Sequence, residues 1–176
     1  NNLGLLYEKG EGVKQDYSKA IEYYEKSAKL NNSTALINLG HLYENGEGVK
    51  QDYSKAIEYF KKAADLGNYK AFNCFAELYE LRFGVKQNYE KALKCYEKST
   101  KSNDSYAFLR IGDFYFNGYG VNVDYSKAIQ NYESSSYFNN SLAHFVLGDI
   151  YSNSDVIESD FDKAIKYFQK SIDIQT

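Results

Sequence analysis

Side chains that commonly carry catalysis are scarce in this chain of 176 residues, which contains two histidines and two cysteines. A catalytic triad needs a nucleophile, a base and a carboxylate that orients the base. Neither His41 nor His144 stands in a recurring arrangement with such partners. By position in the repeat described below, His144 is expected at the edge of a hydrophobic core and His41 on a surface groove. We therefore expect no catalytic residue, and a protein that is not an enzyme.

The two cysteines, Cys74 and Cys95, are too few for a disulfide framework or for a closed zinc site. We expect free, partly buried thiols, with no bound metal or cofactor. A single bridge between the two is the alternative, because only geometry decides whether two thiols can join.

Two loops with the sequence Gly-Glu-Gly, at 10–12 and 46–48, could be read as phosphate-binding loops. A nucleotide-binding glycine loop follows a strand and opens a helix, and it usually brings a lysine or a helix N-terminus to the phosphates. The loops in this chain follow helical patterns, carry a glutamate between the glycines and recur. They indicate helix ends, where glycine tolerates a positive φ.

Composition excludes several classes of function. The 21 basic and 24 acidic residues give a net charge of −3, without the basic excess of a nucleic-acid-binding surface. No stretch approaches the roughly 18 apolar residues of a membrane-spanning helix, and the N-terminus lacks a signal peptide pattern. The chain has no Pro, Met or Trp, against 19 tyrosines. Because it starts without methionine, we expect it to be a fragment of a longer protein.

A repeat of 36 residues organises the chain. The segment from Gly10 to Tyr23 recurs unchanged from Gly46 to Tyr59, and equivalent positions continue in three further copies. The chain is thus one array over 1–176, with approximate repeat boundaries at 1–31, 32–67, 68–103, 104–139 and 140–176. We number these repeats one to five.

Each repeat carries two amphipathic helices separated by the glycine loop. In repeat two, apolar residues follow a helical rhythm over 35–43 and again over 53–64. Gly40 and Ala56 would let the two backbones approach closely. Capping side chains precede the first helices (Asn32, Asn68, Asp104, Asn140) and the second helices (Asp16, Asp52, Asn88, Asp124, Asp160). Because one such pair cannot bury its apolar face alone, the repeats must stack. We expect an all-α fold, a right-handed α-solenoid of about five 36-residue helix-loop-helix repeats.

The repeat pattern is Ala-x-x-x-Leu-Gly-x-x-Tyr, followed by Gly-x-Gly-Val-x-x-Asp-Tyr-x-Lys-Ala-x-x-Tyr-Phe-x-x-Ala-Ala. It resembles the Sel-one-like repeat (SLR), a relative of the tetratricopeptide repeat, over essentially the whole chain. Repeat three departs from it at Ala76 and at Arg82, which replaces the first loop glycine. In repeat five, residues 154–157 (Ser-Asp-Val-Ile) replace the glycine loop. Some bacterial relatives carry a cysteine pair in each repeat, and neither cysteine of this chain matches that register.

The resemblance implies a protein–protein interaction scaffold or adaptor without chemistry of its own. Two alternatives are open. The array could regulate or recruit substrates for a longer enzyme, such as a kinase or the ubiquitin-ligase machinery of endoplasmic-reticulum degradation, or it could be a secreted or lumenal SLR factor. We expect a cytoplasmic location, with the secretory pathway as the alternative. Three Asn-x-Ser sequons, at 31–33, 103–105 and 139–141, favour the secretory pathway only weakly, since turns between repeats also use Asn and Ser for capping.

In the related tetratricopeptide array, the first helix of each repeat lines the concave surface. The equivalent positions of this chain therefore predict a groove along its first helices. Its members are Leu5, Ile37, His41, Glu44, Asn73, Glu77, Glu80, Leu109, Asp113, Phe116, Phe145, Asp149 and Ser152. These positions vary between repeats, as binding positions would, although drift at exposed positions explains this equally well. An apolar floor beside carboxylates suits a peptide with hydrophobic and basic residues. Charge reversal at Glu77, Asp113 and Asp149 is expected to weaken such a partner.

The last helix of repeat five has an apolar face with no following first helix in this sequence to cover it. Its members are Phe161, Ala164, Ile165, Phe168 and Ile172. This face predicts self-association as a further form of binding. The lysines and glutamates along the second helices indicate a solvated surface, to which we assign no function.

Overall fold

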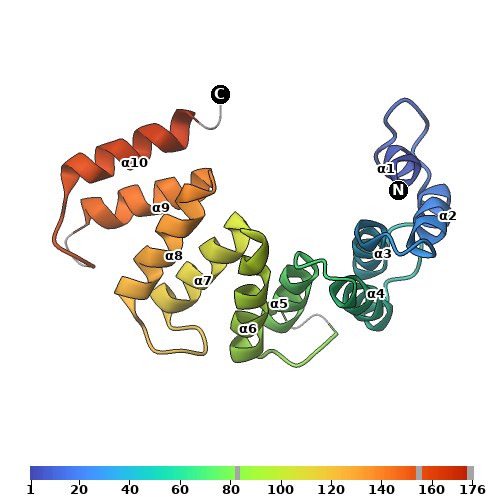
Figure 1. The fold of residues 1–176 in the computed structure, drawn as a ribbon, viewed down its shortest axis with the longest axis horizontal. Helices are drawn as coiled ribbons and strands as arrows, with labels where there is room; N and C mark the ends of the chain where they lie inside the picture. The colour runs from blue at the N-terminus through green and yellow to red at the C-terminus, as the bar shows by residue number, and fades with distance from the viewer. Residues whose placement is uncertain (82–83, 154–155, 174–176) are drawn as a thin grey trace. The chain divides into compact units, whose positions relative to one another are not determined.

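The computed structural model describes residues 1–81, 84–153 and 156–173, and all the regular elements within these ranges are helices (Figure 1). Two compact units divide the chain at residue 87, between the two helices of repeat three. The first unit, Asn1–Gln87, contains α1 (Asn2–Lys9), α2 (Tyr17–Ala28), α3 (Ser33–Asn45), α4 (Tyr53–Asp65) and α5 (Ala71–Leu81). The predicted all-α repeat architecture is confirmed.

The second unit, Asn88–Thr176, begins with α6 (Tyr89–Ser99), which a short 3-10 helix, η1 (Thr100–Ser102), extends. It continues with α7 (Ser105–Asn117), α8 (Tyr125–Tyr137), α9 (Ser141–Ser152) and α10 (Phe161–Asp173). In repeats one, two, four and five the two helices pack side by side, as α9 and α10 do in Figure 1. None of the helices in the described ranges is long and apolar enough to cross a membrane.

Side-chain caps start the helices where the sequence predicts them. The Asp52 carboxylate accepts a hydrogen bond of 3.0 Å from the backbone N–H of Lys55, which satisfies one of the free donors in the first turn of α4. Asp16, Asn88, Asp124 and Asp160 make the same contact three residues on. Asn32, Asp104 and Asn140 likewise accept from backbone N–H groups at the starts of first helices, and Asn68 accepts from the N–H of Lys70, just before α5.

In repeats two to four the glycine loop follows the first helix and also packs against the preceding repeat. Gly46 has a φ of 76°, and its N–H bonds to the carbonyl of Leu42. Gly48 lies against Tyr17 of the previous repeat, so closely that an added Cβ would stand 2.3 Å from the Tyr17 Cβ. The same contact recurs between Gly84 and Tyr53 and between Gly120 and Tyr89. The second loop glycine is therefore a packing site between repeats.

Glycine in the first helices makes room for an aromatic ring. A Cβ on Gly40 would lie 2.3 Å from the buried ring of Phe60 on α4. We expected the small residue to let the two helix backbones approach closely, but the Phe60 ring fills the space beside it. The arrangement recurs in four repeats, with the pairs Gly4 and Tyr24, Gly40 and Phe60, Gly112 and Tyr132, and Gly148 and Phe168.

The turns between repeats account for the sequon asparagines. Asn31, Asn103 and Asn139 have φ values of 59°, 57° and 59°, a conformation that asparagine tolerates better than most residues. Gly67 holds the equivalent position in repeat two, with a φ of 81°. The backbone of these turns therefore explains the recurring Asn.

The departures from the repeat pattern in the loops of repeats three and five lie partly outside the described residues. Arg82, Ser154 and Asp155 lie there, whereas Val156 and Ile157 pack against the core of the second unit. On α10, Phe161, Ile165 and Ile172 are exposed as predicted. Ala164 instead faces the core and Phe168 is half-buried, so the exposed apolar face is narrower than the sequence suggests.

Candidate partner-binding surface

In the first unit, the predicted groove residue His41 contacts Glu44, also a predicted groove residue, and Cys74 of repeat three, which was not one. The His41 Nδ1 atom lies 3.0 Å from Glu44 Oε2, one helical turn along α3. Its Nε2 atom lies 3.8 Å from the Sγ atom of Cys74 on α5. The imidazole also stands edge-on to the Phe60 ring, with 5.2 Å between ring centres. His41 thus links the first helices of two successive repeats.

The Cys74–His41 contact lacks the features of a nucleophilic pair. Burial is the largest cause that raises the pKa of the Cys74 thiol, and the carboxylates of Glu77 and Glu44 add to it. A reactive cysteine needs the opposite shift, toward the thiolate. Cys74 and Cys95 are both free, as expected, and Cys74 is buried. Within the described ranges, no three His, Cys, Asp or Glu residues are grouped so that they could hold a metal ion.

The other predicted groove residues of the first unit are half-buried. They are Leu5 on α1, Ile37 on α3, and Asn73, Glu77 and Glu80 on α5. Ile37 also packs against the core clusters formed by α3, α4 and α5. The apolar floor in this unit therefore contributes to the fold as well as to the surface.

In the second unit, Asp113 is held by two neighbours. Its Oδ2 atom lies 2.6 Å from Arg110 Nη1, and its Oδ1 atom accepts a 2.9 Å hydrogen bond from the hydroxyl of Tyr132 on α8. Tyr132 is buried, and burial together with the nearby Asp113 carboxylate raises the pKa of its phenol. Tyr24 donates in the same way to Glu8 in repeat one. Asp113 therefore connects α7 and α8 through its bond with Tyr132.

Leu109 is a correction to the predicted groove. It is 5% exposed and belongs to the core of the second unit, because α8 and α9 cover it. Phe116 is half-buried against the rings of Tyr125 and Tyr132. These two residues offer little surface to a partner.

The most accessible part of the predicted groove lies on α9. The Phe145 side chain is 54% exposed, and its ring packs against that of Phe168 with 5.7 Å between ring centres. Asp149, one helical turn further on, is exposed. Ser152 is half-buried and its hydroxyl donates to the backbone carbonyl of Asp149.

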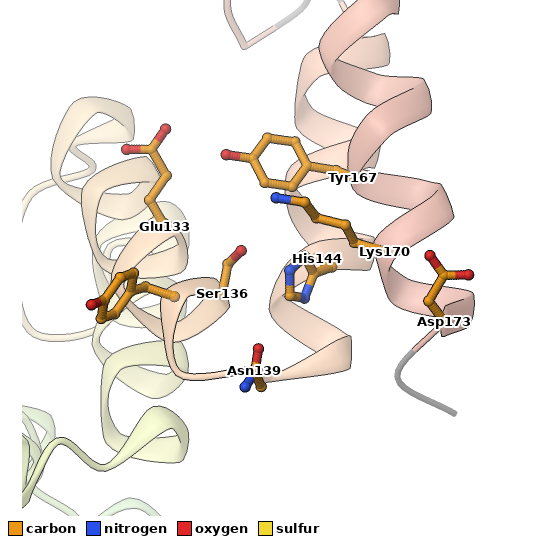
Figure 2. Close-up of a pocket in the computed structure, with 8 residues that line it drawn as sticks. Glu133, Ser136, Asn139, His144, Tyr167, Lys170 and Asp173 are labelled. Atoms are coloured by element: carbon orange, nitrogen blue, oxygen red, sulfur yellow. The ribbon is translucent and has the colours of Figure 1, made fainter. Parts of the chain in front are cut away.

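His144 is buried, as the repeat phase predicts, with 3% of its surface exposed. Its Nδ1 atom lies 2.9 Å from the carbonyl oxygen of Asn140, and since a carbonyl only accepts, Nδ1 carries the proton. The ring borders a hollow of about 470 Å³ between α8, α9 and α10, which also reaches Ser136 and Lys170 (Figure 2).

A stack of lysines and tyrosines beside this hollow was not predicted from the sequence. Tyr151 and Tyr167 lie face to face, and a lysine ammonium stands over the outer face of each ring, Lys163 on one side and Lys170 on the other. Tyrosine and lysine recur at these positions in repeats one and two. That recurrence was a signal of packing, but apolar periodicity alone does not reveal it.

Comparison with known proteins agrees with this geometry. The family model of the Sel1 repeat matches five segments, 1–32, 33–68, 71–104, 105–137 and 141–173. A Sel1 repeat protein from Oxalobacter formigenes has 32% identity and a TM-score of 0.91, over 99% of this chain and 71% of that one. A protective antigen with an SLR fold from uropathogenic Escherichia coli has 31% identity and a TM-score of 0.82, and the similarity covers 98% of this chain but 37% of the antigen.

Cysteine-rich protein B of Helicobacter pylori is 27% identical, with a TM-score of 0.60 over 78% of this chain and 99% of that one. Among curated proteins, none matches the chain significantly. The five matched segments cover nearly all of the sequence and each contains the helix pair of a repeat, so this chain belongs to the Sel1 repeat family.

Proposed function

We propose that this chain is a non-catalytic scaffold that binds a peptide or a partner protein on the exposed face of its first helices. Proteins with Sel1 repeats are generally protein-interaction scaffolds, and the family is typically non-catalytic. The raised pKa of Cys74 supports this proposal, because burial holds the thiol beside His41 in its unreactive form.

The exposure of two side chains on α9 assigns the proposed binding to a specific surface. On α9 the large apolar ring of Phe145 is more exposed than buried, and the Asp149 carboxylate stands one turn away. Neither side chain is needed to close the core of the second unit. An apolar anchor beside a carboxylate fits a partner segment that places a hydrophobic residue next to a lysine or arginine.

The acidic residues of the first unit extend the same chemistry to α3 and α5. Glu44 and Glu77 both raise the pKa of the Cys74 thiol, so both carboxylates lie near it. Such a surface disfavours phosphate backbones, because the carboxylates repel them. The preferred partner is therefore a protein segment with hydrophobic and basic residues.

Selection from a random peptide display library tests this function directly. Peptides enriched on the wild-type chain are expected to combine aromatic or aliphatic residues with lysine or arginine. The double variant Phe145→Ala/Asp149→Lys should bind them at least about tenfold more weakly, because it removes the anchor and reverses the charge. Asp113 is left unchanged, since it holds Tyr132.

A matched control keeps the result specific. Leu66→Ala/Asp65→Lys removes an exposed apolar side chain and reverses one charge in the first unit, at the end of α4. It should bind the selected peptides like the wild type. Equal affinity of the wild type and the Phe145→Ala/Asp149→Lys variant would refute the assignment to α9.

A second candidate function is self-association through α10. Phe161, Ile165 and Ile172 are 65%, 55% and 64% exposed on one helix, which is unusual for side chains of this size. Light scattering after size exclusion should then show a dimer that Ile165→Asp returns to a monomer. A monomeric wild type at high concentration would exclude this candidate.

A further inference from the structure

Repeat five contains an ordered stack of four side chains from α9 and α10. The rings of Tyr151 and Tyr167 are nearly parallel, at 6° and 5.7 Å between centres. The Nζ atom of Lys163 lies 4.9 Å from the centre of the Tyr151 ring, and that of Lys170 lies 5.9 Å from the centre of the Tyr167 ring. Cation–π attraction favours this order, since each ammonium faces the negative surface of a ring.

Repeats one and two contain the same stack in a neutralised form. In repeat two Tyr43 and Tyr59 stack at 5.6 Å, with Lys55 and Lys62 over their outer faces. There the second lysine is also bound to a glutamate one turn earlier, with 2.7 Å from Lys62 Nζ to Glu58 Oε1. Repeat one repeats every element, its ion pair being Lys26 with Glu22 at 2.6 Å.

Repeat five replaces this glutamate by a lysine, Lys166. Among the residues that the structure describes, neither Lys166 nor Lys170 forms an ion pair, while Lys163 lies 3.6 Å from Asp160. Three lysines therefore stand on α10 where repeats one and two place two lysines and a glutamate. They line a hollow of about 200 Å³ together with Glu133, Tyr151 and Tyr167.

The polar groups around this hollow are mostly donors. Burial and the Glu133 carboxylate raise the pKa of Tyr151 to about 12 and raise that of Tyr167, so both phenols stay protonated at physiological pH. Glu133 already accepts a hydrogen bond of 3.3 Å from the Tyr151 hydroxyl. Figure 2 shows Tyr167 and Lys170 reaching from α10 toward Glu133 on α8. Two further carboxylates, Asp162 and Asp173, lie on α10 outside the residues that line the hollow.

We propose that this hollow of repeat five binds acidic side chains of a partner protein, with Lys163, Lys166 and Lys170 as the groups that hold the carboxylates. Ammonium groups and the phenol of Tyr167 are donors that match carboxylate oxygens, and the hollow is the size of a side chain. The site differs from the α9 surface proposed above in the charge of its ligand and in the helix that carries it. It does not depend on that surface.

Titration calorimetry with an acetylated hexaglutamate peptide, at low ionic strength, tests the site. The wild-type chain should bind the peptide at one site. Lys166→Glu restores the residue found in repeats one and two, so it suits the fold. It should weaken binding at least about tenfold, because it removes one ammonium and neutralises Lys170.

The chain offers its own control and a gain-of-function variant. Lys61→Glu makes the same change of charge on α4, at a position where repeats one, three and four carry Glu25, Glu97 and Glu133, and binding should stay within twofold of the wild type. Glu58→Lys frees Lys62 in repeat two and should raise the number of bound peptides from one to two. Circular dichroism and thermal unfolding should show each variant to be folded.

Three results would overturn the proposal. The first is no binding of hexaglutamate by the wild type, and the second is equal affinity for the wild type and Lys166→Glu. The third is displacement of the peptide by an equal concentration of inorganic phosphate, which would assign the hollow to small anions. An unchanged stoichiometry in Glu58→Lys would refute the role given to the freed lysine.

Discussion

The hydroxyl of Tyr132 donates a hydrogen bond of 2.9 Å to the carboxylate of Asp113 and so connects the two helices of repeat four. Arg110 occupies the other carboxylate oxygen at 2.6 Å. Asp113, which the repeat phase assigns to the predicted binding surface, therefore has a structural role. Phe145 and Asp149 on α9 carry no such bond to a neighbouring helix in the described part of the chain, and this makes them the better binding candidates.

Tyr132→Phe is expected to lower the free energy of unfolding by about 1–2 kcal/mol, because a buried hydrogen bond is lost and Asp113 Oδ1 loses a donor. Urea denaturation followed by circular dichroism measures the change. Tyr137→Phe, at an 80% exposed tyrosine on the same helix, should be neutral. Equal effects of the two changes would show that the Asp113 bond contributes nothing.

Stability should decline at alkaline pH. Burial is the main cause that raises the pKa of Tyr24, Tyr132 and Tyr151 above the ordinary value of 10.0. The protonated phenols therefore stabilise the folded state fully below about pH 10. Above that pH the unfolded chain releases these protons first, and stability falls as pH rises toward about 12, the folded-state pKa of Tyr151.

Urea unfolding between pH 8 and pH 11.5 measures this dependence. Each such tyrosine contributes a slope of up to about 1.4 kcal/mol per pH unit. Tyr132→Phe should make the decline shallower, whereas Tyr137→Phe should leave it unchanged. A decline of the same steepness in Tyr132→Phe would exclude Tyr132 as a source.

Gly40→Ala should destabilise the protein by about 1–3 kcal/mol, although alanine favours a helix by about 0.5–1 kcal/mol over glycine. The added Cβ would stand 2.3 Å from the buried Phe60 ring, which cannot move away without disturbing the core. Thr34→Ala on the exposed side of α3 serves as the control, and thermal unfolding is the measurement. A Gly40→Ala variant as stable as the wild type would contradict the packing described for α3 and α4.

Cys95 should react with a thiol reagent at least about tenfold faster than Cys74. Both thiols have raised pKa values because of burial, but Lys98 and Lys91 partly offset this for the half-buried Cys95. At Cys74 the nearby glutamates oppose the thiolate further. The rates are measured with Ellman's reagent on Cys95→Ser and Cys74→Ser, and should become equal in guanidinium. Faster reaction at Cys74 would reopen a chemical role for its contact with His41.

Much of the fold could be predicted from the sequence, because the features that set it are local and recur. Asp52 caps α4 through a residue three positions away, and Gly46 ends α3 through its own backbone conformation. Neither needs knowledge of distant contacts. The step of 36 residues then applies the same assignments to every repeat.

The candidate site was harder to predict because it depends on side-chain contacts between helices. Leu109 shares its phase with exposed Phe145, yet the helices around it cover it. The bond between Asp113 and Tyr132 joins residues 19 positions apart, and helical phase alone does not specify such a partner. The stack of Tyr151 and Tyr167 is similar, since its ring geometry follows from how α9 and α10 pack.

The contact between Gly48 and Tyr17 has a consequence for how such a gene can evolve. In repeats two to four, the second loop glycine packs against the tyrosine of the preceding repeat. That tyrosine starts the second helix in repeats one to four. Deletion of 36 residues between equivalent points would set Gly84 against Tyr17 and restore the same joint. The unchanged segment shared by 10–23 and 46–59 is the kind of sequence at which unequal recombination adds or removes a unit. Repeat number is therefore free to vary while each joint of this kind keeps its chemistry.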